Sequence, residues 1–89
     1  MPQRVVPIVN RLGMHARAAA KFVSLASQYA ADIHVSRDQQ RVNGKSIMGV
    51  MMLAAAQGSE ITIEAEGEDA GEALDALADL VADRFGEES

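Results

Sequence analysis

The sequence predicts an α+β fold in which a four-stranded, mostly antiparallel sheet carries three helices on one face. Several segments alternate apolar and polar residues, as half-buried strands do, and two longer segments repeat apolar residues every three or four positions. The resulting order, β-α-β-β-α-β-α, favours antiparallel neighbours with helices on one side, and the alternation leaves the other side of the sheet in water. The 89 residues are enough for one domain, 1–89, without a second core.

The expected strands are residues 4–9, 32–36, 41–43 and 60–66. Pro7 has no backbone N–H to donate, so we expect the first strand at an edge of the sheet. His34 falls on the solvent side of the second strand by alternation. The residues predicted to face the helices are Val6, Ile8, Ile33, Val35, Ile61, Ile63 and Ala65.

Two of the expected helices are long. The first follows Ala16 and runs to about Tyr29, and the last covers residues 70–85 with Asp69 as its N-cap. The residues after the last helix, 86–89, are expected to be frayed. The predicted apolar stripes are Ala19, Phe22, Val23, Ala26 and Ala30 in the first helix, and Ala70, Leu74, Leu77, Val81 and Phe85 in the last.

The short middle helix, residues 47–53, begins after Ser46, a natural N-cap, and is apolar on every side. Val50 and Leu53 share one side at helical spacing. Ile47, Met48 and Met51 share the other, which so small a domain has little means to bury. We therefore expect a partly exposed, methionine-rich docking surface, with ordinary core packing as the alternative.

Composition and charge narrow the classes of partner. The chain has no Cys and three aromatic residues, which disfavours thiol chemistry, Cys-based metal sites and base-stacking nucleic-acid platforms. No apolar run reaches membrane-spanning length and no signal-peptide core is evident, so we expect a cytoplasmic protein without membrane insertion. Residues 1–46 hold seven basic and two acidic residues, net +5, whereas 47–89 hold one and eleven, net −10. The positive half suits an acidic or phosphorylated partner.

The stretch Gly13-Met14-His15-Ala16-Arg17 lies where the first strand gives way to a helix. The unpaired N–H groups and positive dipole of a helix start attract phosphate and disfavour a charged imidazolium. We therefore expect His15 to be largely neutral near pH 7, with one ring nitrogen free to attack, and Arg17 to reach phosphate oxygens. The alternative is an ordinary polar cap or loop histidine. His15 and His34 lack a third ligand, so no metal site is predicted.

Two segments of the sequence resemble motifs of a known protein family. Gly13–Arg17 is similar to the phosphorylation loop, and Asn43-Gly44-Lys45-Ser46-Ile47-Met48-Gly49-Val50-Met51 to the regulatory serine segment, of the histidine-containing phosphocarrier (HPr) family of the bacterial phosphoenolpyruvate-dependent sugar phosphotransferase system. The similarity runs from about Arg4 to Phe85. It implies an open-faced β-sandwich that acts as a carrier rather than an enzyme, without a cofactor, and we expect a monomer.

The resemblance also implies residue roles. His15 would accept a phosphoryl group at Nδ1 from phosphorylated enzyme I and pass it to an enzyme IIA domain. Arg17 would steady the phosphate, and Ala16 and Arg17 would offer backbone N–H groups to it. Ala18 stands where the family commonly has Pro; alanine keeps the helix but gives it a slightly looser start.

Ser46 is implied to be a regulatory site phosphorylated by an ATP-dependent HPr kinase/phosphorylase, the alternative being a plain N-cap. The partner interface is expected to comprise Ala20, Lys21, Lys45, Ile47, Met48 and Met51. Two other functions stay open: a nitrogen-branch paralogue with the same chemistry, and a small β-α-β regulatory or ligand-binding module in which His15 is incidental. The intact Lys45-Ser46 pair favours the sugar branch over the nitrogen branch.

Overall fold

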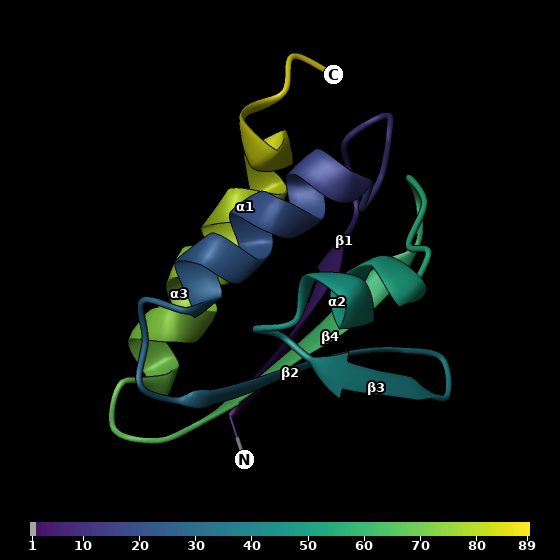
Figure 1. Cartoon of the computed structure of the whole chain (residues 1–89). Coiled ribbons are helices and arrows are strands. Elements are labelled where there is room, and N and C mark those ends of the chain that lie inside the picture. Colours follow the sequence, from purple (N-terminus) through teal and green to yellow (C-terminus); the bar gives the residue numbers. More distant parts are fainter. Residues whose placement is uncertain (1) are drawn as a thin grey trace.

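The computed structural model describes residues 2–89, which form one sheet covered on one face by helices (Figure 1). The chain order confirms β-α-β-β-α-β-α and adds a final 3-10 turn. The elements are β1 Gln3–Pro7, α1 Ala16–Ala26, β2 Asp32–Arg37, β3 Gln40–Asn43, α2 Ile47–Met52, β4 Glu60–Glu66, α3 Ala70–Ala82 and the turn η1 Arg84–Gly86.

The sheet has the strand order β1-β4-β2-β3, and every neighbouring pair is antiparallel. β1 lies at an edge, which confirms the position expected from Pro7. β4 lies between β1 and β2, with Ile63 opposite both Arg4 and Val35. Ile61, Ile63 and Ala65 are buried while their neighbours are not, so the predicted alternation is confirmed in the central strand.

The core lies between the sheet and the helices, where α1 packs against both α2 and α3. Phe22 of α1 and Leu77 of α3 are fully buried, and each such side chain contributes roughly 1.5–3 kcal/mol of burial. All seven strand residues predicted to face the helices are buried. The fold class predicted from the sequence is therefore confirmed.

Both long helices end earlier than predicted. α1 ends at Ala26 because the following turn tightens: Gln28 N–H donates to Leu25 O (3.0 Å) and Tyr29 N–H to Ala26 O (3.2 Å). Ala30 is exposed and does not extend the stripe. α3 ends at Ala82, and the chain then takes left-handed backbone at Arg84 and Phe85 (φ 58° and 55°), which places Phe85 in the core by a different route.

Asp69 is the N-cap residue of α3, as predicted, but within residues 2–89 its side chain makes no cap hydrogen bond to that helix. Its carboxylate instead accepts hydrogen bonds from the N–H groups of Ala30 and Ala31, both at 2.8 Å. The prediction of a frayed tail is wrong at Glu87, whose carboxylate is bonded to the side chains of Asn10 and His15. Each carboxylate finds donors from a segment remote in sequence.

Candidate functional site

The loop that leads into α1 is held in place by its backbone. Gly13 has φ +67°, a left-handed conformation natural to glycine, and a Cβ at this position would lie 2.5 Å from the carbonyl oxygen of Ala55. The same oxygen accepts a hydrogen bond from Met14 N–H at 2.8 Å, and the Met14 side chain is buried. The residue after this anchor is His15, which is thereby fixed at the helix start.

His15 occupies the N-cap position of α1, with extended backbone (φ −76°, ψ −179°). Within residues 2–89 the His15 side chain makes no cap hydrogen bond, so it leaves unpaired the first N–H groups of the helix, which include those of Ala16 and Arg17. This placement at a strand-to-helix switch agrees with the position predicted from the sequence. The arrangement provides an electropositive helix end beside an imidazole.

The imidazole of His15 is partly enclosed, with 28% of its side chain exposed. Its Nε2 forms a hydrogen bond with the carboxylate of Glu87, whereas Nδ1 makes none with any residue in the range 2–89. The other carboxylate oxygen of Glu87 accepts a bond from Asn10 Nδ2 at 2.9 Å. The Asn10 bond, followed by the His15 bond, holds the pKa of Glu87 below its usual value of 4.5.

Asn10 and Glu87 are site residues that sequence reasoning missed. Asn10 is fully buried, and besides Glu87 its Nδ2 binds Gly13 O at 2.8 Å, closing a turn in which Gly13 N–H donates to Asn10 O at 3.2 Å. An Asn three positions before a Gly is a local turn signal that could have singled out Asn10. No local signal marks Glu87, which lies 72 positions from His15.

Arg17 is exposed and makes no side-chain hydrogen bond or ion pair within the described part of the chain. It borders a surface hollow together with His15, Ala16 and Glu87, and the hollow is completed by Arg11, Leu12 and Ser89. The structure therefore brings His15 and Arg17 to one opening, as predicted. A guanidinium without a partner among residues 2–89 is available to an anion bound there.

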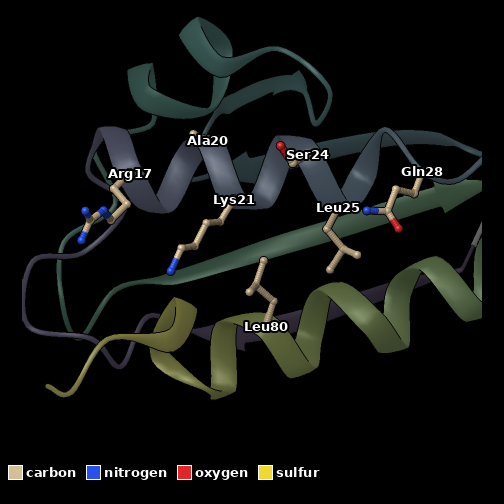
Figure 2. A pocket seen from close by; sticks show the side chains of 7 residues that line it. All are labelled: Arg17, Ala20, Lys21, Ser24, Leu25, Gln28 and Leu80. Carbon is tan, nitrogen blue, oxygen red and sulfur yellow. The ribbon is translucent and has the colours of Figure 1, made fainter.

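Both lysines predicted for the interface donate hydrogen bonds to backbone carbonyl groups of this chain. Lys21 Nζ donates to Phe85 O at 2.6 Å, and Figure 2 shows Lys21 extending from α1 toward the C-terminal turn. Arg17, Ala20 and Lys21 line one end of a groove that α1 and Leu80 form (Figure 2). Lys45 Nζ donates to Tyr29 O at 2.7 Å, beyond the far end of α1. The Lys45 charge is thus not brought together with His15.

The short helix α2 has the two sides that were predicted. Val50 is buried and Leu53, at the C-cap, is also buried, whereas Ile47, Met48 and Met51 are 44%, 70% and 38% exposed. Sequence reasoning missed two further exposed apolar side chains, Met52 of α2 and Leu12 at the hollow beside His15. Ser46 caps α2 as expected, its Oγ accepting from Gly49 N–H at 3.1 Å.

His34 lies on β2, half-buried and paired across the sheet with Asn43 and Glu64. Among residues 2–89 no group of three His, Cys, Asp or Glu side chains is placed to hold a metal ion. None of the helices described here is both long and apolar enough to span a bilayer.

Known proteins resemble the chain throughout its length. Residues 2–83 match the family model described as the PTS HPr component phosphorylation site. The Phosphocarrier protein HPr of Cupriavidus necator is 53% identical over 87 residues, covering 98% of both chains. The Phosphocarrier protein NPr of Shewanella violacea is 41% identical over 87 residues, covering 98% of this chain and 96% of that protein. The crystal structure of HPr-C-His from Thermoanaerobacter tengcongensis superposes with a TM-score of 0.96 at 46% identity, covering both chains completely.

Three findings lead to one conclusion: a loop that presents an imidazole and a guanidinium at a helix start, the matching fold and these full-length relatives. The chain belongs to the HPr family of phosphocarrier proteins of the phosphotransferase system.

Proposed function

We propose that this protein is the phosphocarrier of a sugar phosphotransferase system, which takes a phosphoryl group from phosphorylated enzyme I onto Nδ1 of His15 and delivers it to enzyme IIA domains. The observation that carries the proposal concerns the hollow bordered by His15 and Arg17 at the start of α1. Within residues 2–89, Nδ1 of His15 has no hydrogen-bond partner, and the Arg17 guanidinium has none either. The protein is a carrier and not a turnover catalyst, since the group it accepts is handed on unchanged.

The geometry supports both steps of a relay, the acceptance of the phosphoryl group and its release. The first-turn N–H groups of Ala16 and Arg17 and the Arg17 side chain offer donors to a phosphoryl group on His15. These donors lie at an open, solvent-facing hollow, so they steady the group without enclosing it. A relay needs such moderate binding, because a group held too tightly would not be passed on.

The direct test is labelling. The protein is incubated with enzyme I and phosphoenolpyruvate carrying ³²P, and the label is mapped. We expect acid-labile label on His15 in the wild type and none in His15→Ala. Label that persists in His15→Ala, or none in the folded wild type, would overturn the proposal. The latter result would favour the third possibility, a regulatory or ligand-binding module in which His15 is incidental.

A phosphocarrier role in the nitrogen branch is the second candidate function, and the NPr relative at 41% identity favours it. The two branches share the chemistry at His15 and differ in the proteins that donate and accept the phosphoryl group. Phosphorylated protein is therefore offered to the IIA protein of each branch in parallel. Faster transfer to the sugar-branch acceptor supports the proposal, and faster transfer to the nitrogen-branch acceptor replaces it.

We further propose that Ser46 is phosphorylated by an HPr kinase/phosphorylase and that this weakens docking of enzyme I. A phosphate adds about −1.5 to −2 charges next to the apolar face formed by Ile47, Met48 and Met51. Partners that dock against Arg17 are expected to be acidic, so the added charge repels them. The test compares enzyme I-dependent phosphorylation of wild type and Ser46→Asp; we expect slower labelling of the variant, and equal rates contradict the proposal.

The proposed partner surface consists of the hollow at His15, the exposed side of α2, and Ala20 and Lys21 of α1. Lys45 contributes less than expected from the sequence, because its ammonium is bonded to Tyr29 O. We propose that the free protein is a monomer, which leaves this one face open to several partners in turn. Sedimentation equilibrium at micromolar concentration tests the monomer directly.

A further inference from the structure

The contact between Glu87 and His15 has a role in the phosphoryl relay that the proposed function does not supply. We propose that Glu87 is a positioning residue: by accepting a hydrogen bond from Nε2–H it fixes the His15 tautomer that leaves the Nδ1 lone pair free, with Asn10 holding the carboxylate in place. This inference rests on the proposed function. It concerns how the ring is prepared rather than which residue is phosphorylated.

The hydrogen-bonding capacities of the two groups determine where the ring proton lies. An ionised carboxylate can only accept, while each nitrogen of a neutral imidazole either donates or accepts. The bond between Glu87 and Nε2 therefore requires the ring proton to be on Nε2. In the neutral ring, Nδ1, which has no partner among residues 2–89, then carries the lone pair. The protonation of one ring nitrogen of a histidine is commonly set by the hydrogen bond that the other nitrogen makes.

Glu87 is held by more than its contact with His15. Its second oxygen accepts from Asn10 Nδ2, and Asn10 is fully buried with its own Oδ1 unpartnered in the described structure. Burying Asn10 with an unsatisfied Oδ1 lowers the stability of the fold. We therefore assign the role of Asn10 from the two hydrogen bonds that its Nδ2 does make. Those bonds tie Glu87 and Gly13 together, and through Gly13 they connect to the loop that presents His15.

The backbone before Glu87 is also anchored. Phe85 is fully buried and its carbonyl accepts from Lys21 Nζ, while Arg84 and Phe85 both adopt left-handed backbone that non-glycine residues rarely take. Figure 1 shows the last residues lying beside the N-terminal end of α1. The segment 84–87 is thus shaped to return to the start of α1, and Glu87 is carried there by fixed neighbours.

The proposed tautomer makes the transfer step simple. The Nδ1 lone pair attacks phosphorus, a new N–P bond forms, and the bond between phosphorus and the donor breaks with its electron pair staying on the donor. No proton has to leave Nδ1, because it carries none. The phosphorylated ring keeps its proton on Nε2, where the Glu87 carboxylate balances the positive character that the ring gains. Arg17 and the start of α1 border the same hollow as His15, so their donors would face the phosphoryl group.

The groups around Glu87 favour its ionised form. The bonds from Asn10 and His15 lower the pKa of Glu87, and Lys21 adds a favourable charge. At neutral pH the group that faces Nε2 is therefore an acceptor and not a protonated acid.

Two variants of Glu87 separate tautomer control from simple packing. Glu87→Ala removes the acceptor, so both tautomers of His15 should become populated and transfer from phosphorylated enzyme I should slow by about tenfold. Glu87→Gln keeps the shape but supplies one oxygen and one NH₂ group. Because Asn10 Nδ2 needs the oxygen, the NH₂ faces Nε2 and forces the proton to Nδ1. We expect Glu87→Gln to invert the tautomer and to slow transfer by about a hundredfold, more than the truncation does.

The tautomer is read from ¹H–¹⁵N NMR of ring-labelled histidine at pH 8.5, and transfer is read from the rate of labelling by enzyme I. Glu88→Gln removes one negative charge at the neighbouring exposed position and should leave both readouts at wild-type values. Thermal unfolding of all variants accompanies the measurements. A His15 tautomer that is the same in wild type, Glu87→Ala and Glu87→Gln overturns the inference, as does faster transfer in either variant.

Failure of this inference is distinguishable from failure of the proposed function. If the wild type is labelled on His15 but its tautomer does not respond to Glu87, only the inference falls. If the wild type is not labelled at all, the proposed function falls, while the NMR measurement still reports whether Glu87 sets the tautomer.

Discussion

Replacing Gly13 by Ala tests how the loop before His15 is held. Gly13 has φ +67°, which costs a non-glycine residue roughly 1–2 kcal/mol. The new Cβ would also lie 2.5 Å from Ala55 O and 2.9 Å from Ala56 Cα, and both are backbone atoms that cannot swing aside. Ala55 O accepts the bond from Met14 N–H, so moving it apart sacrifices a buried hydrogen bond at about 1–3 kcal/mol. The expected total loss is about 2–5 kcal/mol.

Two other glycines provide matched controls. Gly58 has φ +91°, and no atom of residues 2–89 lies within 4 Å of an added Cβ, so Gly58→Ala should carry the backbone cost alone, about 1–2 kcal/mol. Gly71 lies in α3 with the same open space and no left-handed backbone, so Gly71→Ala should stabilise the protein by about 0.5 kcal/mol. The difference between the Gly13 and Gly58 variants isolates the contact with Ala55.

Urea unfolding, followed by far-ultraviolet circular dichroism, measures the three free energies. Each kcal/mol should also lower Tm by about 4–8 °C in a chain of this size. We expect the Gly13 variant to lose about 1–3 kcal/mol more than the Gly58 variant. If the two lose the same free energy within about 0.5 kcal/mol, the reasoning that Ala55 confines the His15 loop is refuted.

Three further predictions concern single side chains. Arg17→Ala should change the free energy of unfolding by less than about 0.5 kcal/mol, since Arg17 is exposed and unpaired within residues 2–89, yet slow phosphoryl transfer by roughly 10- to 100-fold; equal losses in urea unfolding and transfer rate would contradict the assigned role. Ser46→Ala should lose about 1 kcal/mol in urea unfolding because the bond to Gly49 N–H is lost, whereas Ser46→Asp keeps an acceptor and should stay near the wild type; an unchanged Ser46→Ala variant would show that the cap contributes nothing. The hydrogen bond from Ala30 N–H lowers the pKa of Asp69 below its usual 3.8, so the ionised Asp69 contributes stability above pH 3.8 that is lost as the pH falls below this value. Asp69→Asn should therefore reduce the loss of unfolding free energy at acid pH, measured by urea unfolding from pH 2 to 6. The same loss in wild type and Asp69→Asn would rule the linkage out.

Much of the fold could be predicted from the sequence because its signals are local. Alternation in 60–66 identified the central strand, and Pro7 identified an edge strand, since each depends only on the backbone of that segment. The same holds for Ser46, whose capping partner Gly49 is three residues away. His15 was placed correctly at a helix start for this reason as well.

The surroundings of the site could not be predicted in this way. Lys21, an interface candidate in the sequence, donates to Phe85 O, which lies 64 positions along the chain. Asp69 is the N-cap residue of α3 as predicted, but its carboxylate binds two N–H groups of the loop after α1, and the residues around Asp69 in the sequence do not reveal these donors. The ends of α1 and α3 were overestimated, because tight turns and left-handed backbone interrupt apolar spacings that continue beyond them.

The sequence by itself determined the elements, their order, the sidedness of α2 and the pairing of His15 with Arg17 at one helix start, because periodicity and capping act over a few residues. Only the tertiary structure decided what faces the other side of the His15 ring. Glu87 and Asn10 are 77 positions apart, and no local pattern encodes a hydrogen bond that exists only once the last turn has folded back against the first loop.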